Sequence, residues 1–114
     1  MEAHSLDVLA ERVVRDGKVA VLYSPGFGAG WSTWGDSEFR DRLLFDPEVV
    51  AWVEGGKVGS LPDLEAKYGV DHFYDGGASD LMIRWVPIGS RFRVHEYDGS
   101  ESVVLFEEED WVLA

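Results

Sequence analysis

The chain has 114 residues, no cysteine, and 22 acidic against 10 basic residues, which gives a formal net charge of −12. The absence of cysteine excludes a disulfide scaffold, a thiolate metal site and a cysteine nucleophile. The negative charge argues against direct binding of nucleic acid, because the protein would repel the phosphate backbone. The length suits a single domain over residues 1–114.

The first elements are expected to be a helix over residues 5–16 and a strand over residues 18–23. Apolar residues recur at helical spacing in the first segment, and Gly17 follows it where a helix commonly ends. No segment has the length of a bilayer span, and the first residues lack the pattern of a signal peptide. We therefore expect a cytoplasmic protein with no membrane partner.

Three further helices are predicted before residue 70. Residues 36–45 carry inward-facing apolar positions, and Asp46-Pro47-Glu48 is a strong start signal for the next helix. A last short helix is expected over residues 61–68, with Ser60 as its N-cap and Gly69 at its end.

Beyond residue 80 the pattern changes to one that predicts strands. The predicted strands are 81–86, 91–97, 102–106 and 111–113. The first two are expected to pair across the turn at residues 87–90, and Asp98-Gly99 predicts a tight hairpin. The fold class is α+β, a small and mostly antiparallel sheet of four to five strands covered by two to three short helices. A helical, loop-rich front (1–80) precedes a β-meander (81–114).

The loop at residues 24–35 is the most unusual segment, with four glycines and three large aromatic residues. It lacks the third glycine of a dinucleotide-binding fingerprint and the Lys-Ser/Thr of a P-loop. Its free backbone N–H groups still suit a phosphate, and Phe27, Trp31 and Trp34 suit stacking on a flat ring. The alternative is a loop folded onto the core by its aromatic residues. A binding role requires both tryptophans to face outward.

The basic residues concentrate in residues 81–94, which hold Arg84, Arg91 and Arg93 and no acidic residue. If strands 81–86 and 91–97 pair, Arg84 and Arg93 lie near one another. These side chains suit either salt bridges with the acidic remainder of the chain or the binding of a phosphate or carboxylate.

The motifs of catalysis and metal binding are absent. His4, His72 and His95 do not have metal-ligand spacing, and no nucleophile motif is present. We therefore expect no metal, no cofactor and no enzymatic activity. A small hydrolase that uses carboxylates with His72 or His95 is kept as an alternative.

Acidic residues gather in two regions, with eleven in residues 36–80 and seven in residues 95–114. One interpretation is a solvated surface. The other is a decoy that imitates nucleic acid and occupies a basic, nucleic-acid-binding partner protein, and charge reversal within Glu107–Asp110 tests it.

Five stretches carry a resemblance to a known group of proteins: 19–34, 44–47, 74–78, 85–94 and 96–102. They are similar to small uncharacterised proteins of tailed bacteriophages and prophages. The resemblance implies a phage or prophage origin, action inside a bacterium and an accessory role, and it implies no enzymatic activity.

The leading hypothesis is a non-catalytic binding protein that uses the aromatic glycine-rich loop. Its partner is expected to be a host protein or a nucleotide-like ligand. An edge strand near residues 103–106 also allows a homodimer. The candidate binding residues are Phe27, Trp31, Trp34, Tyr74, Arg84, Arg91 and Arg93.

Overall fold

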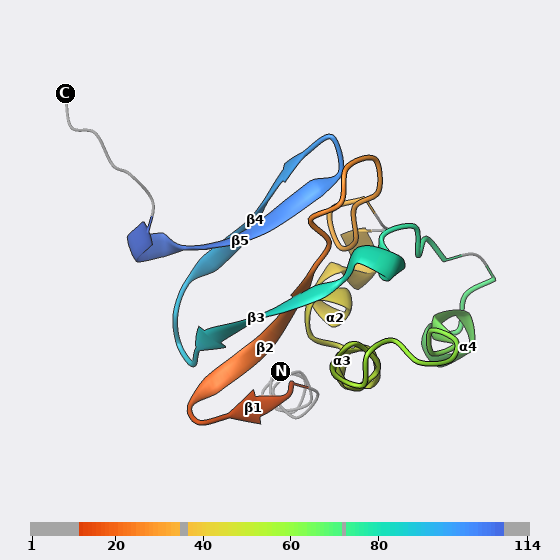
Figure 1. The fold of residues 1–114 in the computed structure, drawn as a ribbon, viewed down its shortest axis with the longest axis horizontal. Helices are drawn as coiled ribbons and strands as arrows, with labels where there is room; N and C mark the ends of the chain where they lie inside the picture. Colours follow the sequence, from red (N-terminus) through yellow and green to blue (C-terminus); the bar gives the residue numbers. More distant parts are fainter. Residues whose placement is uncertain (1–11, 35–36, 72, 109–114) are drawn as a thin grey trace.

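The computed structural model describes residues 12–34, 37–71 and 73–108, and its strands form two antiparallel sheets (Figure 1). The first sheet has the order β1 (Val14–Arg15), β2 (Lys18–Tyr23) and β3 (Met82–Pro87). The second is a hairpin of β4 (Phe92–Tyr97) and β5 (Ser100–Leu105). The α+β class expected from the sequence is therefore confirmed.

Strand β2 is buried on both faces, which explains its nearly continuous apolar sequence. Ala20 and Leu22 belong to a core cluster with residues from the helices, while Val19 and Val21 pack with Val103 of β5. In the view of Figure 1, α2, α3 and α4 gather on one side of β2 and β3, and the β4–β5 hairpin lies on the other. The chain thus packs helices and a hairpin against opposite faces of one short sheet.

The helices between residues 37 and 68 lie close to the predicted ones, whereas the two 3-10 helices after residue 70 were not predicted. In chain order, the helices are the 3-10 helix η1 (Ser37–Phe39), α2 (Arg40–Phe45), α3 (Pro47–Glu54), α4 (Leu64–Tyr68), and the 3-10 helices η2 (Ala78–Asp80) and η3 (Phe106–Glu108). Asp46 caps α3 as predicted, because its side chain accepts hydrogen bonds from the backbone N–H groups of Glu48 and Val49. Helix α4 starts later than predicted: Pro62 disfavours a helical residue before it, and Asp63 is the N-cap in place of Ser60.

The predicted helix over residues 5–16 is wrong in its last part, and residues 1–11 lie outside the described structure. Val14 and Arg15 form β1, which pairs with Val19 and Lys18 of β2. Asp16 and Gly17 both have positive φ, as a tight type I′ hairpin turn requires. The Asp-Gly pair therefore turns the chain between two strands, where Gly17 alone had indicated a helix end.

The predicted pairing of strands 81–86 and 91–97 is also wrong. Strand β3 pairs with β2 over its whole length, and β4 pairs with β5 in the other sheet. After β3, the backbone N–H of Ile88 bonds to the carbonyl of Gly17 at 2.9 Å, which holds the end of β3 beside the first hairpin. The Asp98-Gly99 hairpin is as predicted, with positive φ at both turn residues. The predicted strand at 111–113 lies outside the described residues.

Candidate functional site

A buried carboxylate of β5 holds the glycine-rich loop from the inside. Glu101 is 2% exposed, and its Oε1 accepts a hydrogen bond of 2.9 Å from the backbone N–H of Ser24. Its Oε2 accepts from the backbone N–H groups of Trp31 (2.8 Å) and Thr33 (3.0 Å) and from the Thr33 hydroxyl (2.6 Å). The loop N–H groups do cradle an anion, as the sequence suggested, but this anion is a side chain of the protein itself.

The tip of the β4–β5 hairpin lies directly against the same loop. The backbone N–H of Gly28 donates to the carbonyl of Asp98 at 2.6 Å, and the Ser100 hydroxyl donates to the carbonyl of Pro25 at 2.7 Å. A Cβ atom at Gly99 would stand 2.5 Å from the backbone nitrogen of Ala29, a separation that side chains do not tolerate. Glycine at this position therefore permits the contact between hairpin and loop, in addition to its role in the turn.

Trp31 is a core residue, which corrects its expected place on the binding surface. Its side chain is fully buried, and the indole Nε1 donates to the backbone carbonyl of Leu43 at 2.8 Å. Its backbone N–H is one of the donors to Glu101. Trp31 therefore anchors the loop to helix α2 and is unavailable to a ligand in this structure.

Three other aromatic residues face outward around the clamped loop. Phe27 is 74% exposed, Trp34 is 43% exposed and Tyr97 is 74% exposed. Phe27 precedes Gly28, whose backbone N–H bonds to the carbonyl of Asp98 at the hairpin tip, and Tyr97 lies at that tip. We call Phe27, Trp34 and Tyr97 the aromatic rim. Tyr97 is not among the binding residues predicted from the sequence, although its position beside the Asp98-Gly99 turn was a usable signal.

Tyr74 borders the rim through Trp34. Their ring centroids are 6.3 Å apart, and the ring planes are tilted by 43°. Burial raises the pKa of the Tyr74 hydroxyl, and the negative charges of Glu101 and Asp75 raise it further. The structure thus brings Tyr74 and Trp34 together, as the sequence hypothesis required.

The three arginines predicted as a group occupy different places. Arg84 of β3 donates from Nη1 to the backbone carbonyl of Val103 at 2.6 Å, which ties the two sheets together. The Arg91 guanidinium lies 5.9 Å from the centroid of the Phe106 ring. Arg93 lines a groove beside helix α2. Arg84 and Arg93 belong to different sheets because β3 and β4 do not pair.

Acid is expected to release Trp34 from its position on the rim. The carboxylate of Glu96 accepts hydrogen bonds from the backbone N–H of Gly99 and from the Trp34 indole N–H, the latter at 3.0 Å. Both bonds lower the pKa of the Glu96 carboxyl group. Because the pKa of Glu96 is lowered in the folded protein, the carboxylate and its two hydrogen bonds are fully present above the ordinary pKa of 4.5. They are lost only as the pH falls through the lower pKa of the folded state. The chemical shift of the Trp34 indole N–H, followed by NMR, should therefore change with a midpoint below 4.5.

Glu96→Gln is the control for this titration, and it should remove the transition. A midpoint at or above the ordinary glutamate value, or the same transition in the Gln variant, would contradict the assignment.

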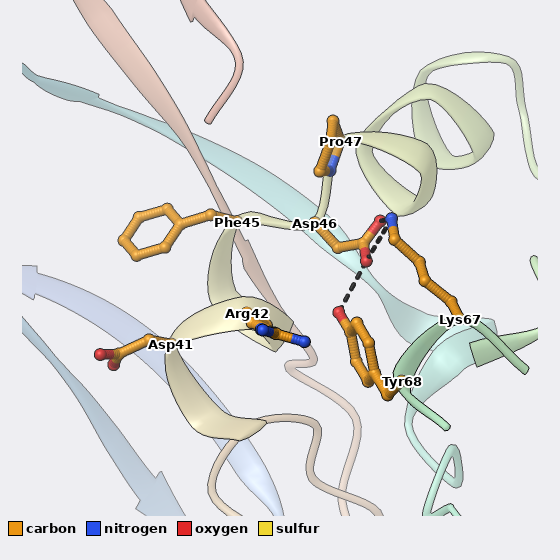
Figure 2. Close-up of a pocket in the computed structure, with 7 residues that line it drawn as sticks. All are labelled: Asp41, Arg42, Phe45, Asp46, Pro47, Lys67 and Tyr68. Carbon is orange, nitrogen blue, oxygen red and sulfur yellow. Dashed lines mark hydrogen bonds and ion pairs between the residues drawn. The ribbon is translucent and has the colours of Figure 1, made fainter. Parts of the chain in front are cut away.

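A second buried carboxylate, Asp46, joins α3 to α4 (Figure 2). Beyond the N-cap bonds, its oxygens accept from Lys67 Nζ at 3.0 Å and from the Tyr68 hydroxyl at 2.7 Å. Burial lowers the pKa of Lys67, but hydrogen bonds to Glu48 and Asp46 outweigh that effect and raise it overall. The cavity beside this cluster has a volume of about 210 Å³. Because the donors around Asp46 come from both helices, we assign the cluster to the stability of the helix pair.

Comparisons of the chain with protein-family models, with curated proteins and with solved structures give no match. Within the described ranges, no group of three or more His, Asp or Glu side chains is arranged to hold a metal ion. The helices in the same ranges are too short or too polar to cross a membrane. His72 lies outside the described residues, and His95 is exposed on β4.

Proposed function

We propose that this protein is a non-catalytic accessory protein of phage or prophage origin that binds a host protein in the bacterial cytoplasm. The aromatic rim is the proposed contact surface. The observation that carries the proposal is the exposure of Phe27 and Tyr97, both 74%, on backbone segments held together by hydrogen bonds. Exposed aromatic side chains on a fixed backbone bury large areas on binding at small cost in conformational entropy.

The clamp of Glu101 supports this proposal, because its hydrogen bonds fix the loop before any partner is bound. Trp34 adds to the same argument, since its indole is held by Glu96 while almost half of its surface stays exposed. Aromatic residues of this kind commonly dominate the binding energy of protein interfaces.

The test is a quantitative pull-down from bacterial lysate with the wild type and the double variant Phe27→Ala/Tyr97→Ala. Truncation of interface aromatics typically costs about tenfold or more in affinity, so the captured protein should be lost from the double variant. Its thermal stability should stay close to that of the wild type, because both side chains are largely exposed.

Val58→Ala is the matched control, since Val58 is an apolar residue that is 82% exposed and lies outside the rim. This variant should retain the captured protein. The same set of proteins bound to all three baits would contradict the proposal. Light scattering on the wild type and the double variant gives a second test: a dimer that the double variant loses would identify the partner as another copy of the chain, against a host protein.

A further inference from the structure

The three segments that carry the aromatic rim and Tyr74 have acidic residues but no basic partner for them within the same segments. They are residues 24–34, 73–81 and 95–102, and together they contain no lysine and no arginine. Their acidic residues are Asp75, Asp80, Glu96, Asp98 and Glu101. Complementary charge steers and orients protein association, so these segments favour a partner surface that carries positive charge.

Two exposed acidic residues border the Phe27 end of the rim. The Asp80 carboxylate lies against Gly26, because a Cβ atom on Gly26 would collide with it. Asp98 is exposed at the hairpin tip, and its backbone carbonyl accepts the hydrogen bond from Gly28. The exposed ring of Phe27 therefore lies, along the loop, between two residues that each contact an acidic residue.

A buried negative charge lies beneath the same loop. The hydrogen bonds that Glu101 accepts come from neutral donors, namely backbone N–H groups and the Thr33 hydroxyl. A charge in a buried site is screened less by water and salt than an exposed one. Its effect reaches Tyr74, because the charges of Glu101 and Asp75 add to the effect of burial in raising the pKa of the Tyr74 hydroxyl. The electrostatic potential beside Trp34, which contacts Tyr74, is therefore negative.

Positive charge adjoins this surface in two places. Lys57 Nζ donates to the backbone carbonyl of the residue before Asp80 at 2.8 Å. Arg40 and Arg93 line the groove beside helix α2 that Glu96 also lines. These cations offset part of the charge of Asp80 and Glu96, so the inference rests on the other three acidic residues.

Trp34 offers the kind of ring that cations prefer, since tryptophan attracts a cation over its face more strongly than tyrosine or phenylalanine does. Glu96 holds the indole by its N–H at 3.0 Å, while 43% of the residue stays exposed. The one hydrogen-bond donor of the side chain is thus satisfied within the protein, and the exposed remainder is apolar ring surface. An arginine suits such a site better than a lysine, because its planar guanidinium stacks on a ring while its N–H groups bond to carboxylates.

We propose that the partner surface that meets the aromatic rim is basic and places an arginine side chain against Trp34. This inference rests on the protein-binding function proposed above and specifies the chemistry of the partner. Asp75 and Asp98 attract the basic surface, and Phe27 and the other rings of the rim pack on the apolar stems of its side chains.

Tetraarginine with blocked termini is the probe, and NMR titration of the full chain is the measurement. We expect saturable shifts of rim resonances, tighter binding than that of tetralysine, and weaker binding as NaCl is added. Asp98→Asn should weaken binding about two- to fivefold, as loss of an exposed ion pair does. Asparagine tolerates the positive φ of this position, so the turn is retained. Asp75→Asn should act in the same direction, and Trp34→Ala should weaken binding by a similar factor.

Asp16→Asn is the matched control. Asp16 is also an exposed aspartate with positive φ before a glycine, but its turn joins β1 to β2 at the end of β2 opposite to the loop. The variant makes the same change of charge in the same kind of turn, and it should bind tetraarginine like the wild type. Glu107→Gln should also bind like the wild type, which separates the rim from the acidic run of the decoy interpretation.

Equal weakening by Asp98→Asn and Asp16→Asn would overturn the proposal, because the probe would then respond only to the net charge of the protein. Tetralysine binding as tight as that of tetraarginine would also overturn it, as would the absence of saturable shifts at the rim up to about 10 mM probe.

The pull-down separates this inference from the function on which it rests. Loss of the captured protein from Phe27→Ala/Tyr97→Ala, with retention by Asp75→Asn/Asp98→Asn, would support the protein-binding function and contradict the basic partner. Loss from both variants, with retention by Asp16→Asn, would support both proposals.

Discussion

Replacement of Glu101 by alanine should lower the free energy of unfolding by about 3–5 kcal/mol, because it removes a buried charged acceptor and leaves its donors unpaired. Three backbone N–H groups and the Thr33 hydroxyl bond to this carboxylate. Glu101→Gln should lower the free energy of unfolding by less, about 1–3 kcal/mol. One side-chain oxygen still accepts hydrogen bonds in this variant, while the amide NH₂ that replaces the other oxygen faces a donor. Urea denaturation measures both changes.

Glu107→Ala is the control for this series, because Glu107 is an exposed acidic residue in η3. Its effect on unfolding should stay within about 0.5 kcal/mol. If Glu101→Ala were as mild as Glu107→Ala, the carboxylate would not hold the loop.

The two tryptophans of the loop should respond very differently to truncation. Trp31→Ala should lower the free energy of unfolding by about 3–5 kcal/mol, because it leaves a large cavity in the core. It also removes the hydrogen bond from the indole to the Leu43 carbonyl. Trp34→Ala should cost about 1 kcal/mol or less, since the side chain is 43% exposed and its bond to Glu96 lies at the surface. Thermal or urea unfolding of the pair gives the comparison.

Comparable losses from the two variants would contradict the assignment of Trp31 to the core and Trp34 to the rim. The pair also tests the sequence hypothesis directly. That hypothesis gave both indoles the same outward role, since their spacing of three residues gave no reason to separate them.

Local signals in the sequence were reliable where a few adjacent residues decide the structure. Asp46-Pro47 predicted the start of α3, and Asp98-Gly99 predicted the β4–β5 turn, because caps and tight turns depend on neighbouring atoms. Asp16-Gly17 carried the same turn signal, but the apolar spacing before it favoured a helix. In the described part of this segment the turn signal was correct, because Asp16 and Gly17 form the turn between β1 and β2.

The candidate site depends on contacts that no local pattern contains. Glu101 is separated from its donors Ser24, Trp31 and Thr33 by 77, 70 and 68 residues. In the sequence it is one of 22 acidic residues and lies just before the predicted strand 102–106, with nothing to mark it as buried. The groove beside helix α2 is equally non-local, because Arg12, Arg40 and Arg93 reach its lining from three separate segments.

The clamp formed by Glu101 is tested most directly by hydrogen exchange at the amides that bond to it. The account predicts that the amides of Ser24, Trp31 and Thr33 exchange as slowly as those in the β2–β3 ladder, although all three lie in a loop. Exchange of these amides at the rate of exposed loop positions such as Val58 would contradict the account, because the loop would then open without unfolding of the sheet.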